Sequence, residues 1–369
     1  MVQRDTLEKS FLKPQIMSWT VRQFSKGQID RAGAALVAAQ KSAANIDPEL
    51  EIINNWRACH GYPLHAIKMT LLRRAKTVAS SAVIAQRLKR LPSIGLKLEH
   101  NPAMKLSQMQ DIGGCRAVMP SIGGLHDVIG IYERSKSKNP RSGRPVQHER
   151  YDYIQNPKPD GYRSYHLIFK YQSEYEDKKP FEGQRIEIQI RTQLQHAWAT
   201  AVETVQTFTG QALKSKIKTG DPQWLRFFSL MGSAMALREN CSTVPDTPRT
   251  KTELVREIRE LSRTLSVEGV LSGWGMAVQK LTASPGDAVA FLLVLDANQK
   301  TLATTPFKSD ELQEASEAYL RVEREMGNRP EIQAVLVSVE DVEALRAAYP
   351  NYYLDTSAFI EAVKVAIRR

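Results

Sequence analysis

Three polar side chains alternate with isoleucines near the middle of the chain. The segment 183–192 reads GQRIEIQIRT, so that isoleucines separate Glu187, Gln189 and Arg191. Successive side chains of a β-strand point to opposite faces, and a strand here would place the three polar groups on one face and the isoleucines in a core. A carboxylate, an amide and a guanidinium in a row suit a metal–phosphate site. A half-exposed strand with a wet face would show the same pattern.

A second segment combines a rigid turn, a lysine and an aromatic ring. Residues 152–166 read DYIQNPKPDGYRSYH, in which two prolines and an Asp-Gly pair predict a turn. A strand is expected over 162–169, and its period of two would place Tyr162 and His166 on one face. Tyr162 could stack on a base while Lys158 contacts phosphate, although a tyrosine in this position is also typical of a core.

Two further segments supply an acid and several cations. Asp111 precedes two glycines at the expected start of a strand, where glycine lets phosphate approach the backbone and an acid can bind Mg²⁺. Upstream, residues 87–97 read RLKRLPSIGLK, in which Ser93 is expected to cap a helix and Lys97 to follow one turn later. Together the four segments hold the metal ligands, cations and aromatic ring that phosphoryl-type transfer needs.

These four segments resemble the synthetase region of the RelA/SpoT family. The matching signatures, in the family's order, are R-x-K-x-x-x-S-I-x-x-K at 87–97, D-I-x-G-x-R at 111–116, D-Y-I-x-x-P-K-x-x-G-Y-x-S-x-H at 152–166 and E-x-Q-I-R-T at 187–192. The resemblance implies an α+β fold with a nucleotidyltransferase-like mixed β-sheet flanked by helices. It also implies a Mg²⁺-dependent pyrophosphokinase that moves the β,γ-pyrophosphate of ATP to the 3′-hydroxyl of GTP or GDP, which makes a guanosine alarmone.

The resemblance also implies a role for each matching residue. Catalysis and metal binding would fall to Asp111 and Glu187, with Glu187 also activating the attacking hydroxyl. The residues that bind ATP would be Arg87, Lys89, Ser93, Lys97 and Arg116. Those that bind the acceptor, with Tyr162 stacking on its base, would be Lys158, Asp160, Tyr162, His166, Gln189 and Arg191. The family usually has Asn or Ser where this chain has Asp160, which leaves the acceptor more open than the donor.

The elements that must position these residues fall into two groups. Up to residue 239, we expect helices at 29–44, 49–80 (interrupted at Gly61), 193–205 and 223–239, with short strands and helices alternating over 81–210. Beyond residue 252, we expect an order of helix, two strands, helix, strand and helix at 253–266, 288–295, 301–307, 309–326, 332–339 and 357–367. The predicted division is an N-terminal helical segment (1–48), a synthetase domain (49–239), a linker (240–252) and a C-terminal α+β domain that regulates or oligomerises (253–369).

The bulk composition restricts the class of protein. Residues 1–252 carry 38 Lys and Arg against 22 Asp and Glu, a net charge of +16, whereas residues 253–369 carry 13 against 18, a net of −5. A basic front part attracts nucleotides or RNA. Three scattered cysteines exclude a disulfide framework and a C-x-x-C zinc site. The longest apolar stretch has eight residues, so we expect a cytoplasmic protein with no membrane partner, which can form a homo-oligomer.

Two other functions remain open. The first is that of the family's toxic members, which pyrophosphorylate the 3′ end of tRNA or adenosine nucleotides; here the acidic C-terminal part would restrain the basic part. The second is a non-catalytic nucleotide-binding regulator, which the presence of both Asp111 and Glu187 disfavours. Only 86 residues precede Arg87, so we expect a synthetase without the hydrolase domain of the family's long members.

Overall fold

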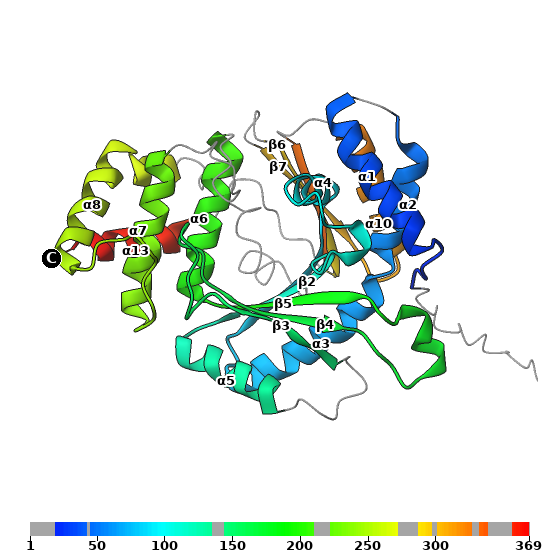
Figure 1. Ribbon diagram of the computed structural model, residues 1–369, viewed down its shortest axis with the longest axis horizontal. Helices are drawn as coiled ribbons and strands as arrows, with labels where there is room; N and C mark the ends of the chain where they lie inside the picture. Colours follow the sequence, from blue (N-terminus) through cyan, green and yellow to red (C-terminus); the bar gives the residue numbers. More distant parts are fainter. Residues whose placement is uncertain are drawn as a thin grey trace, which may run out of the picture.

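A single β-sheet forms the centre of the molecule (Figure 1). The structure is a computed structural model that describes residues 19–42, 45–134, 144–209, 222–271, 287–296, 301–326, 332–338 and 356–368. Within these ranges eight strands pair in the order β3-β4-β5-β2-β1-β8-β6-β7. The strands are β1 (Val83–Leu88), β2 (Gly113–Met119), β3 (Arg144–Asp152), β4 (Tyr165–Lys170), β5 (Arg185–Thr192), β6 (Ala290–Asp296), β7 (Thr301–Phe307) and β8 (Ile332–Ser338).

The helices surround this sheet in three groups. Two helices, α3 (Gly61–Val78) and α5 (Ile122–Arg134), lie beneath it in the view of Figure 1. A second group, at the left, consists of α6 (Gln193–Thr209), α7 (Pro222–Arg238), α8 (Lys251–Thr264) and α13 (Ser357–Ile367). The third, at the right, consists of α1 (Lys26–Ser42), α2 (Asp47–Ala58), α4 (Leu91–Glu99) and α10 (Leu312–Met326). Short 3₁₀ helices occur at Leu106–Gln108 and Glu176–Phe181.

The sheet is mixed, as the resemblance implied. Strands β2 and β5 run parallel, and the other paired neighbours in the described sheet run antiparallel. The isoleucines of β5 (Ile186, Ile188 and Ile190) are fully buried in a core that α3 and α5 complete. Burial of this apolar face fixes the register of β5 and turns its polar residues to the opposite face. The predicted α+β class with a mixed sheet flanked by helices is confirmed.

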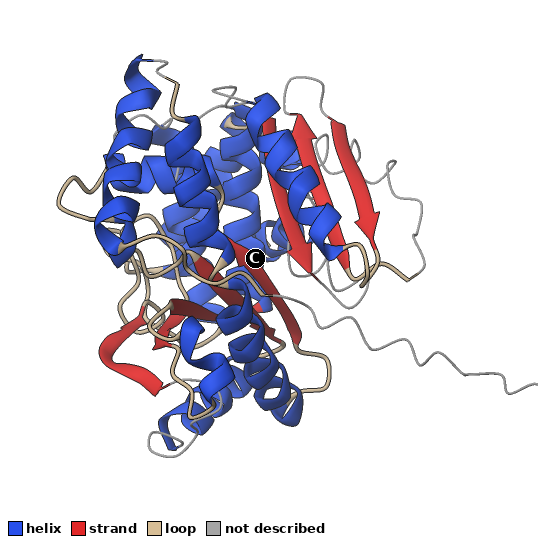
Figure 2. Ribbon diagram, turned by 90° about the vertical axis from the view of Figure 1, so that its right-hand side faces the viewer, coloured by secondary structure: helices blue, strands red, loops and turns tan. Residues whose placement is uncertain are grey.

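The segments on either side of the predicted linker pack together. Strand β8 pairs with β1 at Gln86 and Arg87, so β6, β7 and β8 extend the same sheet, and α10 covers them (Figure 2). Helices α8 and α13 share a core with α6 and α7, in which Phe359 of α13 contacts Phe227 and Phe228. The chain after residue 252 therefore packs against the preceding part in two places, at β1 and at α6 with α7. The proposed boundaries of the domains stay a prediction, and residues 1–18 of the N-terminal segment lie outside the described ranges.

Two local expectations are wrong. Ser93 does not cap a helix, because α4 begins at Leu91 and its N-cap residue is Arg90. A proline is tolerated in the first turn of a helix, so α4 begins ahead of Ser93 and includes it. Strand β4 begins at Tyr165 rather than at residue 162, because the chain is still leaving a turn at Gly161. Among the described residues, no helix combines the length and the apolar character needed to cross a membrane.

Candidate active site

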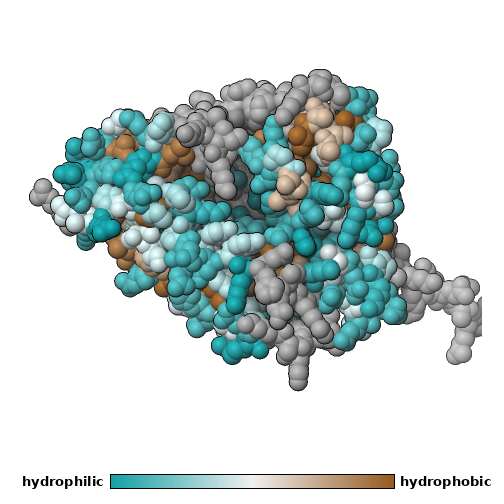
Figure 3. Space-filling model, in the orientation of Figure 1, coloured by the Kyte–Doolittle hydropathy of each residue, from teal (hydrophilic) through white to brown (hydrophobic). Residues whose placement is uncertain are grey.

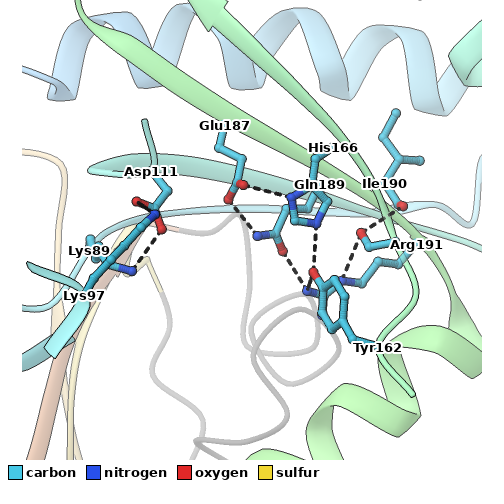
Figure 4. Close-up of polar contacts among 10 residues, drawn as sticks. Lys89, Lys97, Asp111, Tyr162, His166, Glu187, Gln189, Ile190 and Arg191 are labelled. Carbon is cyan, nitrogen blue, oxygen red and sulfur yellow. Dashed lines mark hydrogen bonds and ion pairs between the residues drawn. The ribbon is translucent and has the colours of Figure 1, made fainter. Parts of the chain in front are cut away.

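Five polar side chains form a closed ring of hydrogen bonds on the polar face of β4 and β5 (Figure 4). Arg191 Nη2 donates to Tyr162 Oη (2.7 Å) and to Gln189 Oε1 (2.8 Å). Gln189 Nε2 donates to Glu187 Oε2 (2.7 Å), and the other oxygen of Glu187 lies 2.9 Å from His166 Nδ1. His166 Nε2 closes the ring, 2.8 Å from Tyr162 Oη. The structure thus brings together five residues that the sequence placed in two separate motifs.

The charges within this ring set the protonation of its members. Burial raises the pKa of Glu187, but His166 and Gln189 outweigh it and hold the pKa below its usual value, so Glu187 is a carboxylate at neutral pH. Burial opposes protonation of His166, yet Tyr162 and Glu187 raise its pKa. Burial also disfavours the Tyr162 phenolate, whereas Arg191 and His166 lower the pKa of Tyr162 to about 7. The hydrogen bonds of the ring thus link three titratable groups whose pKa values depend on one another.

A second cluster contains Asp111 and two lysines. Lys89 Nζ donates to Asp111 Oδ2 (2.9 Å) and Lys97 Nζ to Asp111 Oδ1 (2.8 Å). Lys89 follows β1, Lys97 lies in α4 and Asp111 precedes β2, so three neighbouring elements meet here. Burial raises the pKa of Asp111, but the two lysines hold it well below its usual range. Both carboxylate oxygens therefore carry charge, and the lysines are within reach of an anion that competes with Asp111.

The two clusters fit a divalent metal ion. Figure 4 shows Asp111 beside Glu187, and the charge of Asp111 acts to raise the pKa of Glu187. Two charged carboxylates that influence one another in this way could serve as oxygen ligands for a hard cation. Within the described part of the chain, no group of three or more His, Cys, Asp or Glu side chains could hold a metal. Proteins commonly bind Mg²⁺ through one or two carboxylates, while phosphates and water complete its shell.

The predicted arginines lie on the same face of the sheet. Gly114 of β2 pairs with Arg87 in β1 and with Glu187 in β5. Arg116, two residues further along β2, pairs with Gln189. In-register neighbours point to the same side of a sheet, so both arginines share the polar face with the ring. The surface drawn in Figure 3 is largely hydrophilic and is hollowed near its centre.

Aromatic rings and a lysine extend the site beyond Tyr162. Lys158 Nζ lies 4.4 Å from the ring centre of Tyr153 and 5.0 Å from that of Tyr162. Tyr153 stacks on Tyr151, with ring centres 5.9 Å apart and planes 5° from parallel, and Tyr151 is 38% exposed. Sequence reasoning missed Tyr151 and Tyr153, although the alternation in RYDYI, just ahead of the turn, was a usable signal.

The turn that presents Tyr162 is fixed against two helices. Gly161 has a φ of +97°, and a Cβ there would lie 2.7 Å from the carbonyl oxygen of Phe228 and 2.9 Å from the Trp198 ring. Asp160 Oδ1 accepts the backbone N–H of Tyr162 (2.9 Å), so the carboxylate predicted to contact the acceptor has a partner within the turn. The position of Tyr162 therefore depends on the approach of this turn to α6 and α7.

We expect Gly161→Ala to destabilise the fold and to displace Tyr162. The left-handed backbone and the contact with Phe228 should together cost at least about 2 kcal/mol of unfolding free energy. Urea denaturation measures this loss. Gly123→Ala is the matched control, because its new Cβ would lie 4.0 Å from the nearest side-chain atom; equal stability of the two variants would contradict the account.

A buried ion pair supports the same region of the chain. Arg163, 3% exposed, donates through Nη2 to Glu239 Oε2 (3.0 Å). Glu239 also accepts from Thr192 Oγ1 and from Gln195 Nε2 (3.2 Å for the latter). The end of α7 is thereby joined to the junction of β5 and α6, directly after Arg191. No local pattern could have predicted it, because Glu239 lies 44 to 76 residues from its partners.

Part of the chain matches the model of a known protein family. Residues 86–208 match the region found in RelA/SpoT proteins. The GTP pyrophosphokinase YwaC of Bacillus subtilis is 34% identical over 92 residues, which cover 25% of this chain and 40% of that protein. The aligned part is thus less than half of the length of this relative.

Solved structures with a similar chain trace include two small alarmone synthetases from Bacillus subtilis. Small alarmone synthetase 2 has a TM-score of 0.40 and 21% identity, and the match covers 50% of this chain and 93% of that one. Small alarmone synthetase 1, bound to its product pppGpp, has a TM-score of 0.38 and 21% identity, with 48% of this chain and 90% of that one covered.

Proposed function

The chain carries a RelA/SpoT region, and we propose that it is a pyrophosphokinase that transfers the β,γ-pyrophosphate of ATP to the 3′-hydroxyl of GTP or GDP. The observation that carries this proposal is the pair of clusters on one sheet face. Asp111 and its two lysines provide a site for phosphate. Glu187 belongs to the ring of hydrogen bonds, which also contains the aromatic side chain of Tyr162. A donor and an acceptor can bind next to one another there.

On the donor side, the triphosphate of ATP would bind the cations near Asp111. Lys89 and Lys97 would exchange the Asp111 oxygens for phosphate oxygens, and Arg87 and Arg116 lie on the same face. The exchange leaves the Asp111 carboxylate available, together with Glu187, for Mg²⁺. When bound, Mg²⁺ would neutralise charge on the phosphate oxygens and make the β-phosphorus more electrophilic.

The transfer makes one bond and breaks one bond. The acceptor's 3′-oxygen attacks the β-phosphorus of ATP, and the bond from that phosphorus to the oxygen shared with the α-phosphate breaks, so that AMP leaves with that oxygen. Glu187 accepts the hydroxyl proton, and His166, 2.9 Å away, holds Glu187 as the carboxylate that this step needs. The ring holds Glu187 in one orientation during this step.

On the acceptor side, the guanine would stack on an aromatic ring. Lys158 lies over Tyr153 and Tyr162 and would contact the acceptor's phosphates. The Tyr162 hydroxyl is bonded to His166 and Arg191, which fixes the ring plane that the base would meet. We expect the enzyme to act in the cytoplasm, where both nucleotides are found; whether it forms an oligomer stays a prediction.

One observation favours a second acceptor, the 3′ end of tRNA. Tyr151 stacks on Tyr153 and is 38% exposed, so a second base could stack beyond the first. The net charge of +16 over residues 1–252 would attract such a polyanion. Restraint by the acidic C-terminal part belongs to this alternative. A truncation at 252 is a poor test of restraint, because it would strip α8 and α13 from the core they share with α6 and α7.

The experiment offers labelled ATP and Mg²⁺ with GDP, GTP, ADP or deacylated tRNA in separate reactions. Label on GDP or GTP is the expected result. Label on tRNA or ADP instead would retain the chemistry and replace the acceptor. Binding of ATP without transfer to any acceptor would point to the non-catalytic regulator. The adenosine acceptor serves as an internal control for base selection, because ADP and GDP differ only in the base.

A further inference from the structure

A buried cluster connects the C-terminal part of the chain to the ATP side of the site. Arg57 of α2 donates through Nη1 to Glu323 Oε2 (2.9 Å) and through Nη2 to the hydroxyl of Tyr319, and both acceptors belong to α10. The Tyr319 hydroxyl in turn donates to Glu323 Oε1. These three residues are between 3% and 9% exposed. A buried carboxylate and guanidinium with several hydrogen bonds each hold a single geometry.

This cluster contacts the backbone on both sides of Arg90. Arg57 Nε donates to the carbonyl oxygen of Lys89 (3.0 Å), and Glu323 Oε1 accepts from the backbone N–H of Leu91 (3.3 Å). Lys89 is one of the two lysines on Asp111, and Leu91 is the first residue of α4. The cluster therefore holds the chain where it passes from β1 to α4.

Helix α4 has no cap from its own segment. Its N-cap residue Arg90 makes no capping hydrogen bond with its side chain, and its first turn contains no acidic residue. The first N–H groups of a helix lack partners within the helix and favour a negative charge nearby. The carboxylate of Glu323 provides a hydrogen-bond partner and a negative charge, from a helix more than 200 residues away in the sequence. Because Lys97 lies in α4, the orientation of this helix decides where its ammonium group points.

A second contact joins the same parts of the chain through the main chain. Strand β8, which α10 packs against, pairs with β1 at Arg87 and Gln86. Arg87 is two residues before Lys89 and lies on the polar face of the sheet. The backbone of the ATP side is thus held at β1 by β8 and at the start of α4 by α10.

We propose that Glu323 and Tyr319, which lie outside the RelA/SpoT region, are positioning residues for ATP binding and act through Arg57 on Lys89 and α4. This inference rests on the proposed function for its choice of ligand. It assigns to the C-terminal part of the chain a supporting role at the donor site, in which an intact contact favours ATP binding. The acceptor side, which the ring of β4 and β5 forms, should not depend on it.

The test compares the full-length protein with the Glu323→Gln and Tyr319→Phe variants. Hydrogen–deuterium exchange should rise in peptides that cover 89–99 and stay unchanged in peptides from β4 and β5. The dissociation constant for a non-hydrolysable ATP analogue should rise about tenfold for Glu323→Gln, and less for Tyr319→Phe, which keeps the ion pair. The KM for the acceptor should not change. Glu314→Gln, on the exposed side of α10, is the matched control.

A double variant separates positioning from stability. Arg57→Met with Glu323→Met replaces the buried ion pair by apolar side chains, which often preserves stability. We expect this variant to stay folded and still to bind the analogue weakly, because the contacts with Lys89 and Leu91 are gone. Analogue affinity at the wild-type level in a folded double variant would overturn the proposal. So would unchanged exchange of α4 in Glu323→Gln.

Failure of the proposed function gives a different pattern. If the wild-type protein transferred pyrophosphate to no acceptor, the enzyme assignment would fall, while the exchange of α4 and the affinity for the analogue would still decide the inference. If the wild-type protein did not bind the analogue, both would be overturned. A rise in exchange of α4 with no change in analogue affinity would overturn the inference alone.

Discussion

Glu187→Gln is expected to reduce pyrophosphate transfer by about 10³-fold or more, because it removes the proposed metal ligand, which is also the proposed acceptor of the hydroxyl proton. Glutamine keeps the size of the side chain and can still bond to Gln189 and His166. It cannot carry the negative charge that His166 and Gln189 stabilise in Glu187. The fold and the affinity for the acceptor should therefore change little while kcat falls.

Steady-state rates for the variant and the wild type, at saturating ATP and acceptor, measure this effect. Glu174→Gln is a suitable control, since this glutamate is exposed in the loop after β4 and contacts neither cluster. Because the charge of Glu187 helps to raise the pKa of His166, the variant should also have a lower pKa at His166. A variant that retained a tenth of the wild-type kcat would show that Glu187 neither holds the metal nor accepts the proton.

Asp111→Asn is expected to reduce kcat by about 100-fold without weakening ATP binding in the absence of Mg²⁺. The reason is that Asp111 would act on the metal, whereas Lys89 and Lys97 would act on the phosphates. Without the carboxylate, the two lysines that now bond to its oxygens stay available for the triphosphate. Mg²⁺ should then strengthen nucleotide binding less in the variant than in the wild type.

Titrations with an ATP analogue, with and without Mg²⁺, separate these two roles. Asp127→Asn serves as the control, because Asp127 is exposed on α5 at the opposite face of the sheet. A large loss of affinity in the absence of metal would contradict the account, since it would mean that Asp111 is needed to place the lysines rather than to bind Mg²⁺.

Sequence patterns predicted the parts of the site that a single strand or turn encodes. The alternation in β5 correctly placed Glu187, Gln189 and Arg191 on one face, because burial of the isoleucines leaves no other register. The four signatures correctly pointed to a RelA/SpoT region, which the family model confirms over residues 86–208. The roles of the single residues within it stay predictions.

Contacts between distant segments could not be predicted in this way. Serine is a residue type that commonly caps helices, but at the start of α4 it is Glu323, not Ser93, that accepts a hydrogen bond from the backbone of Leu91. In the sequence, 232 residues separate Glu323 from Leu91. The lysines predicted to bind phosphate are paired with the predicted metal ligand Asp111, an arrangement that only the meeting of β1, α4 and β2 creates. The pairing of β8 with β1 is likewise a property of the whole sheet and not of either strand.

The fate of the two transferred phosphates tests the central claim most directly. ATP labelled separately at the β- and γ-phosphates is incubated with the wild-type protein, Mg²⁺ and the acceptor, and the nucleotide products are separated. Both labels should appear on the acceptor in equal amounts, with one AMP released for each product formed, and neither should move in Glu187→Gln. Transfer of the γ-label alone, with release of ADP, would identify an ordinary kinase and contradict the account.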